Sequence, residues 1–124
     1  MYNSKISGLG FYVPDNVVTN EDLSKIMDTS DEWIQERTGI KQRHWIKEGS
    51  NETSATMGAR AAEIAIERAG LDKDDIDFII FATLSPDFYF PGCGVQIQEM
   101  LEMRTIGALD IRNQCSGFVY ALST

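Results

Sequence analysis

The sequence predicts an α/β fold, because helical and strand patterns alternate along its 124 residues. Residues 51–69 repeat alanine and isoleucine at helical spacing, which is typical of a helix packed closely against a sheet. Residues 78–83 form a continuous apolar run, the pattern of a strand buried on both faces of a parallel sheet. Parallel strands need crossover connections, and the intervening helices supply them. We therefore expect a layered α/β architecture.

The chain opens with a segment that is expected to form a strand. Residues 5–13 alternate, with Gly8 and Gly10 at points where something packs closely, and Pro14 ends the run. The two glycines do not start a dinucleotide-binding fingerprint, because the third glycine is lacking and no helix follows directly. A short helix is expected over residues 19–27, since a polar cap precedes acidic residues in its first turn.

A second helix combines an aromatic and a basic side chain on one face. It is expected to begin with Thr29 or Ser30 as its cap, and Glu32 is placed to complete a capping box with Thr29. Trp33 and Arg37 are four residues apart and share one helical face. An indole stacks on a purine and a guanidinium holds phosphate, which together suit coenzyme A. A half-buried tryptophan beside a surface arginine explains the same pattern without a ligand. Three more basic residues follow within ten positions: Lys41, Arg43 and Lys47.

The middle of the chain is expected to continue the alternation. Gly70 ends the helix over residues 51–69, and an acidic connection leads to the strand over residues 78–83. Residues 85–91 form a loop that holds three aromatic residues between two prolines, and a helix through about Met103 follows. Taken alone, these aromatic side chains are explained as a cover for the core.

The strongest chemical feature is a cysteine at a strand-to-helix corner. Residues 105–111 are β-rich and residues 118–122 open a helix, which places Cys115 at a helix N-terminus. The partial positive charge and unpaired N–H groups there favour thiolate over thiol. Ser116 and Gly117 are small, so an acyl group can approach backbone N–H groups that would hold an oxyanion beside the sulfur. The alternative is a buried cysteine that only fills space.

Three segments resemble one family. Residues 113–123 (NQCSGFVYALS) are similar to the active-site cysteine segment of β-ketoacyl-acyl-carrier-protein synthase III, a condensing enzyme of the thiolase superfamily. Residues 29–40 (TSDEWIQERTGI) and 52–58 (ETSATMG) also match that family, in the same order and at similar spacing. The likeness covers essentially the whole chain, and three ordered motifs are far more specific than one cysteine.

The resemblance implies a thiolase-like layered α/β fold and a decarboxylative Claisen condensation. An acyl coenzyme A primer would acylate Cys115, and malonyl-acyl carrier protein would then supply the second carbon unit, which initiates fatty-acid biosynthesis. In the family, the equivalents of Thr29, Trp33 and Arg37 lie at the mouth of the coenzyme A tunnel. The equivalent of Phe90 reaches across a dimer interface and closes the partner's acyl pocket. The resemblance implies no metal and no tightly bound cofactor, because the coenzyme A thioester is a substrate.

The resemblance also implies that the chain is incomplete. Family members are longer, with two similar halves, and complete the site with a histidine and an asparagine from the second half. The single histidine here, His44, lies away from any family catalytic position. We therefore expect residues 1–124 to be the first part of the N-terminal half and to be inactive alone. The expected partners are acyl coenzyme A, malonyl-acyl carrier protein, the remainder of the enzyme and a second copy in a homodimer.

Two other functions stay open. Another thiolase-family enzyme could use Cys115 and Trp33 to join long acyl chains or to acylate a secondary metabolite. The Arg-Asn-Gln run before Cys115 departs from the small residues often found there in the family, which leaves the primer and the acceptor open. A non-catalytic domain that binds a protein or an acyl carrier is the second alternative.

Composition narrows the remaining possibilities. With 43% hydrophobic and 24% charged residues, disorder is not expected, and no apolar run approaches the length of a transmembrane helix. A net charge of −8 argues against non-specific nucleic-acid binding. The N-terminus lacks the pattern of a signal peptide, so a cytoplasmic location is expected. The spacing of Cys93 and Cys115 suits no metal site, and both are expected to remain thiols, with Cys93 a buried or loop thiol.

Overall fold

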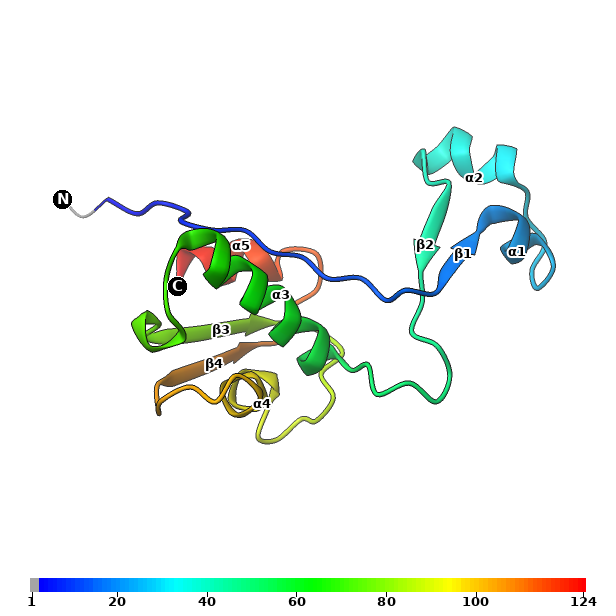
Figure 1. The fold of residues 1–124 in the computed structure, drawn as a ribbon. Coiled ribbons are helices and arrows are strands. Elements are labelled where there is room, and N and C mark those ends of the chain that lie inside the picture. Colours follow the sequence, from blue (N-terminus) through cyan, green and yellow to red (C-terminus); the bar gives the residue numbers. More distant parts are fainter. Residues whose placement is uncertain (1–2) are drawn as a thin grey trace. The chain divides into compact units, whose positions relative to one another are not determined.

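The computed structural model describes residues 3–124, which divide into two compact units. One unit comprises residues 13–52, and the other comprises residues 3–12 and 53–124. Helices and strands alternate through both (Figure 1), which confirms the expected α/β class. No helix within the described part of the chain has the length and apolar character needed to cross a membrane.

The unit of residues 13–52 contains a short antiparallel strand pair that the sequence patterns did not reveal. β1 (Val17–Thr19) pairs with β2 (Gln42–His44), and α1 (Asn20–Ser24) and α2 (Asp31–Thr38) lie between them in sequence. The Thr19 hydroxyl accepts a hydrogen bond from the Asp22 amide, and the Asp22 carboxylate accepts one from the Thr19 amide. This reciprocal cap confirms the expected start of the first helix, which ends at Ser24 rather than near residue 27.

Ser30, and not Thr29, caps α2. The Ser30 hydroxyl oxygen accepts a hydrogen bond from the Trp33 amide at 3.1 Å. The Thr29 hydroxyl oxygen is buried and has no hydrogen-bond partner among the described residues. The predicted capping box between Thr29 and Glu32 is therefore wrong, because the helix begins one residue too late for Thr29 to reach its first amides.

Asn20 is the buried polar centre of this unit and is only 1% exposed. Its side-chain amide nitrogen donates to Asp31 Oδ1 at 2.7 Å and to the Ile40 carbonyl oxygen at 2.8 Å. Its side-chain oxygen accepts from the Arg43 guanidinium. Asn20 thus joins α1, α2 and β2 through one set of hydrogen bonds. The buried apolar side chains of the unit are Leu23 and Ile34.

The larger unit is built on a parallel strand pair. β3 (Phe78–Ala82) pairs with β4 (Gly107–Ile111), with Phe78 opposite Gly107 and Ala82 opposite Ile111. Parallel pairing was expected. The expected burial of β3 on both faces is wrong for the described residues, because Phe78 is 54% exposed. Within this part of the chain, β3 pairs along one edge only, and its apolar side chains after Phe78 are half-buried. The helical elements of the unit are α3 (Ser54–Ala69), η1 (Lys73–Asp75), α4 (Cys93–Met100) and α5 (Gly117–Ser123).

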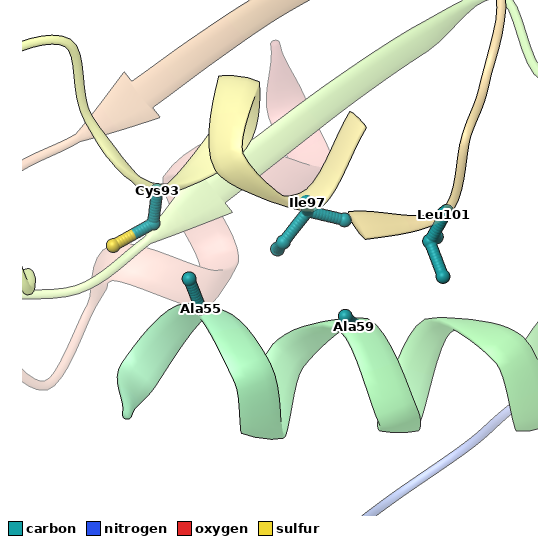
Figure 2. Packing of buried hydrophobic residues seen from close by; sticks show 5 residues of the cluster. All are labelled: Ala55, Ala59, Cys93, Ile97 and Leu101. Atoms are coloured by element: carbon teal, nitrogen blue, oxygen red, sulfur yellow. The ribbon is translucent and has the colours of Figure 1, made fainter. Parts of the chain in front are cut away.

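The core of the larger unit lies between α3 and α4. Ala55 and Ala59 of α3 face Cys93 and Ile97 of α4, and Leu101 continues the row (Figure 2). Alanine has a small side chain, so the two helices approach closely. The predicted close packing of α3 is confirmed, but the main partner of its alanine face is α4 and not a sheet. The left-handed Gly70, with φ of 67°, ends α3 as expected.

The expected strand at the start of the chain is not formed. Residues 3–12 are extended without a strand partner and pack along α3. A Cβ atom at Gly8 would lie 2.1 Å from the Ala65 carbonyl oxygen, and one at Gly10 would lie 2.1 Å from the Ala61 carbonyl oxygen. The prediction of close packing at these glycines is confirmed, whereas the predicted strand is wrong because the packing partner is a helix.

The last predicted helix boundary also differs. α4 ends at Met100 and not near Met103, because Glu102 takes a left-handed conformation with φ of 51°. The chain then turns into β4, so the strand begins at Gly107 within the expected range of residues 105–111.

Candidate active site

Cys115 lies at the corner between β4 and α5, as the sequence predicted. β4 ends at Ile111 and α5 begins at Gly117, so the thiol stands two residues before the helix. Cys115 is free and exposed. The carboxyl ends of two parallel strands meet here, since the Thr83 amide extends the pairing by donating to the Ile111 carbonyl oxygen at 3.1 Å. Ligands of parallel α/β sheets bind at this edge.

The turn around Cys115 is held by short local contacts. The Ser116 hydroxyl donates to Asn113 Oδ1 at 3.0 Å, and the Gly117 amide donates to the Gln114 carbonyl oxygen at 3.1 Å. Gly117 is buried, and a Cβ atom there would lie 3.4 Å from the Cβ atom of Ala82. The turn therefore packs directly on the end of β3 and presents the sulfur on its outer side.

Cys93 differs from Cys115 in being buried. It is fully buried as the first residue of α4, and burial raises the pKa of its thiol. A protonated thiol without access is a poor nucleophile. Of the two possibilities expected for Cys93, a buried or a loop thiol, the structure confirms the buried one.

Two carboxylates that the sequence patterns did not single out hold the helices around this edge. Asp110, in β4, accepts from the Cys93 amide at 2.7 Å and from the Gly94 amide at 3.1 Å, and so caps α4. Asp87 accepts from the Ser54 and Ala55 amides, each at 2.7 Å, and so caps α3. Both partners are more than ten residues away in sequence, whereas capping rules consider only neighbouring positions.

Phe90 lies on the loop between β3 and α4 and is 90% exposed. Its neighbours Phe88 and Tyr89 are 61% and 84% exposed. The alternative that these aromatic side chains cover the core of the described chain is therefore wrong. The loop presents three large rings to its surroundings while Asp87 fastens its backbone to α3.

Trp33 and Arg37 form one exposed surface on α2. The guanidinium carbon of Arg37 lies 4.4 Å from the centroid of the Trp33 ring, and the indole is 53% exposed. The pair therefore meets on one helical face as predicted. Thr29 lies just before this helix and lines a hollow of about 580 Å³ together with Ser30 and Lys41.

The basic cluster and the histidine are partly structural. Arg43 donates to the Val18 carbonyl oxygen at 3.1 Å and to Asn20, so its charge is engaged within its own unit. His44 Nδ1 lies 2.5 Å from the Pro14 carbonyl oxygen. The residues predicted for coenzyme A belong to the unit of residues 13–52, whereas Cys115 belongs to the other unit. Within residues 3–124 no group of three or more histidine, cysteine or acidic side chains is arranged to hold a metal ion.

No family model matches the chain, but individual proteins do. It is 51% identical over 124 residues to the β-ketoacyl-[acyl-carrier-protein] synthase III of Rhizobium meliloti, covering all of this chain and 38% of that protein. Among solved structures, it resembles the 3-oxoacyl-[acyl-carrier-protein] synthase III of Aquifex aeolicus, with a TM-score of 0.91 and 48% identity over 98% of this chain and 38% of that one. The priming β-ketosynthase of the R1128 polyketide pathway gives a TM-score of 0.89 and 34% identity over 96% of this chain and 35% of that one.

These similarities define the class of the protein as a thiolase-like α/β condensing-enzyme fold. The chain belongs to the β-ketoacyl-[acyl-carrier-protein] synthase III family. It spans about 38% of the length of the curated relatives that it matches.

Proposed function

We propose that this chain is part of an acyltransferase that condenses an acyl coenzyme A primer with malonyl-acyl carrier protein, the step that initiates fatty-acid biosynthesis. The observation that carries the proposal is the exposed Cys115 at a strand-to-helix turn, in a chain about half identical to this family. Residues 1–124 would be part of the N-terminal thiolase-like half of that enzyme. The free thiols of Cys93 and Cys115 suit a cytoplasmic location.

In the first half-reaction, the Cys115 thiolate attacks the thioester carbonyl carbon of acyl coenzyme A. A carbon–sulfur bond to Cys115 forms and the coenzyme A thiolate leaves. Ser116 and Gly117 keep the turn small, so the carbonyl oxygen can approach backbone N–H groups at the start of α5.

In the second half-reaction, the malonyl group on acyl carrier protein loses carbon dioxide and becomes a carbanion. The carbanion attacks the acyl carbon on Cys115, a carbon–carbon bond forms, and the Cys115 thiolate is released. A thiolate is a good leaving group, which makes the acyl thioester more reactive than a serine ester would be.

The exposed surface of Trp33 and Arg37 is proposed to bind coenzyme A. Arg37 already lies against the indole, so an adenine can stack on the uncovered part of the ring while the guanidinium pairs with phosphate. Thr29 is proposed to contribute from the start of α2. Phe90 is proposed to wall the acyl pocket of a second copy in a homodimer, because its ring is almost fully exposed.

Mass spectrometry tests the nucleophile. Brief incubation of the complete enzyme with acetyl coenzyme A should place one acetyl group on Cys115 and none on Cys93, which is buried. Cys115→Ser should abolish condensation while the circular dichroism melt is retained. Acetylation of Cys93, or condensation by the serine variant, would show that Cys115 is not the nucleophile.

A second assay tests how the site is completed. The resemblance assigns a histidine and an asparagine to the other half of family members, and His44 bonds within its own unit. The chain of residues 1–124 should therefore form no condensation product from acetyl coenzyme A and malonyl carrier. Robust product formation would refute this view of the site.

A related condensing enzyme with another acceptor is the second candidate. It is supported by the likeness to the priming β-ketosynthase of a polyketide pathway. Comparing turnover of acyl coenzyme A primers of different length, and of different malonyl carriers, separates the two candidates.

A further inference from the structure

Arg112 connects the segment of Cys115 with the aromatic loop. It directly follows β4 and precedes Cys115 by three positions. Its Nη2 atom donates a hydrogen bond to the Tyr89 carbonyl oxygen at 3.0 Å. Its guanidinium carbon lies 5.1 Å from the centroid of the Tyr89 ring. One side chain therefore holds both the backbone and the ring of Tyr89.

The two ends of the aromatic loop are fixed by other contacts. Near its start, Asp87 caps α3, and the Ser85 carbonyl oxygen accepts from the Ser54 hydroxyl at 2.9 Å. At its end, the Gly92 carbonyl oxygen accepts from the Gln96 side chain at 3.0 Å. Arg112 reaches the middle of the loop through the Tyr89 carbonyl oxygen and ring.

Packing does not hold this middle part in place. Tyr89 and Phe90 are 84% and 90% exposed, so few neighbouring atoms restrict their rings. Arginine suits the task because its planar guanidinium stacks on an aromatic face and donates hydrogen bonds at the same time. Lysine offers a compact charge without the plane, so it can replace only part of this contact.

We infer that Arg112 is a positioning residue that fixes Tyr89 and thereby the place of Phe90, and so determines which acyl chain lengths the condensing site accepts. The inference rests on the proposed function, because it needs Phe90 to wall an acyl pocket. It also assigns a role to Arg112, which stands before the cysteine where family members often have a small residue.

The first measurement does not depend on activity. Nitrogen-15 relaxation of the complete enzyme gives order parameters for the Tyr89 and Phe90 amides. In Arg112→Ala they should fall from about 0.85, typical of rigid backbone, to below about 0.6. Arg112→Lys should give intermediate values. The matched control is Arg60→Ala, which removes an arginine 4.7 Å from the Tyr12 ring centroid elsewhere in the same unit. Unchanged order parameters in Arg112→Ala would overturn the inference.

The second measurement uses the complete enzyme and the ratio of kcat/KM for a longer acyl coenzyme A primer to that for acetyl coenzyme A. Arg112→Ala should raise this ratio by about threefold to tenfold. This change is a part of the total discrimination between primer lengths that one pocket wall provides. Arg112→Lys should recover part of the original ratio, and Arg60→Ala should leave it unchanged.

Phe90→Ala distinguishes a failure of the inference about Arg112 from a failure of the proposed role of Phe90. If it raises the ratio and Arg112→Ala does not, the inference for Arg112 is overturned while the proposed function stands. If neither variant changes the ratio, the proposed role of Phe90 fails and the specificity role of Arg112 fails with it. Acetylation of Cys115 would still report on the proposed function by itself.

Discussion

Replacing Asp87 with alanine should destabilise the larger unit through the start of α3. The two carboxylate oxygens of Asp87 accept hydrogen bonds from the Ser54 and Ala55 amides, each at 2.7 Å. Ala55 is fully buried, so its N–H group would lose its partner in a place that water does not reach. The Ser54 amide is nearer the surface and water can replace the lost bond there.

The size of the effect follows from these two bonds. An unsatisfied buried N–H group costs about 1–3 kcal/mol, and loss of a carboxylate at a helix N-terminus costs about 0.3–1 kcal/mol. We therefore expect the free energy of unfolding to fall by about 2–3 kcal/mol in Asp87→Ala. Asp87→Asn should lose about half as much, because the amide keeps one acceptor oxygen.

Urea unfolding followed by far-UV circular dichroism measures this change. Asp74→Ala, an exposed carboxylate in the same unit, is the control and should change the free energy of unfolding by less than about 0.5 kcal/mol. Equal destabilisation by Asp87→Ala and Asp74→Ala would refute the reasoning.

The pH dependence provides an independent check on Asp87. Burial by itself raises its pKa, but the hydrogen bonds from the Ala55 and Ser54 amides and the Thr53 hydroxyl outweigh burial and hold the pKa below its ordinary value. A lowered folded-state pKa stabilises the fold above the unfolded-state pKa of about 4, and the stabilisation is lost as pH falls through the folded-state pKa. The difference between the original chain and Asp87→Ala should therefore shrink below about pH 4. A difference that stays constant into acid would contradict the electrostatic part of the argument.

Three further outcomes are expected. Trp33→Ala or Arg37→Ala in the complete enzyme should each reduce kcat/KM for acyl coenzyme A by the equivalent of about 1–3 kcal/mol, because stacking or phosphate pairing is lost. Unchanged kinetics in both variants would show that the pair is only a structural contact. Asn20→Ala should destabilise the unit of residues 13–52 by about 2–4 kcal/mol, because the three hydrogen bonds of a fully buried side chain are lost. Tryptophan fluorescence reports this change, since both tryptophans lie in that unit, and an unshifted transition would argue against it. Iodoacetamide should modify the exposed Cys115 at least about 1,000-fold faster than the buried Cys93, because Cys93 reacts only when the core opens. Comparable rates of modification would contradict the observed burial of Cys93.

Local patterns predicted the elements whose determinants are close in sequence. The alanine repeat, Gly70 and the turn at Cys115 all act within one or two helical turns, and the structure confirms the corresponding helices and the corner. The Ser30 cap was within reach for the same reason, but choosing between Ser30 and Thr29 required knowing where the first helical turn begins.

Elements that depend on distant partners were missed or mistaken. β1 and β2 are three residues each, too short for a clear alternation, and their pairing joins positions on either side of two helices. Residues 3–12 have a strand pattern, yet their glycines meet α3 instead of another strand. Asp87, Asp110 and Arg112 gain their roles from partners that only the folded chain brings near. Local patterns indicated Cys115 and the pair of Trp33 and Arg37 as candidates, each beside a purely structural alternative. The family resemblance decided between those alternatives and supplied the roles of Thr29 and Phe90.

The parallel pairing of β3 with β4 also bears on how the chain is made. Paired positions are about 30 residues apart, so at ordinary rates of synthesis β3 leaves the ribosome about 1.5–6 s before its partner exists. During that delay its apolar sequence, FIIFA, has no partner strand, and segments of this composition associate with those of other nascent chains. The carboxylates of Asp74, Asp75 and Asp77 lie directly before it in the sequence. Their mutual repulsion between neighbouring chains opposes such association, so the acidic connection protects the strand until β4 arrives.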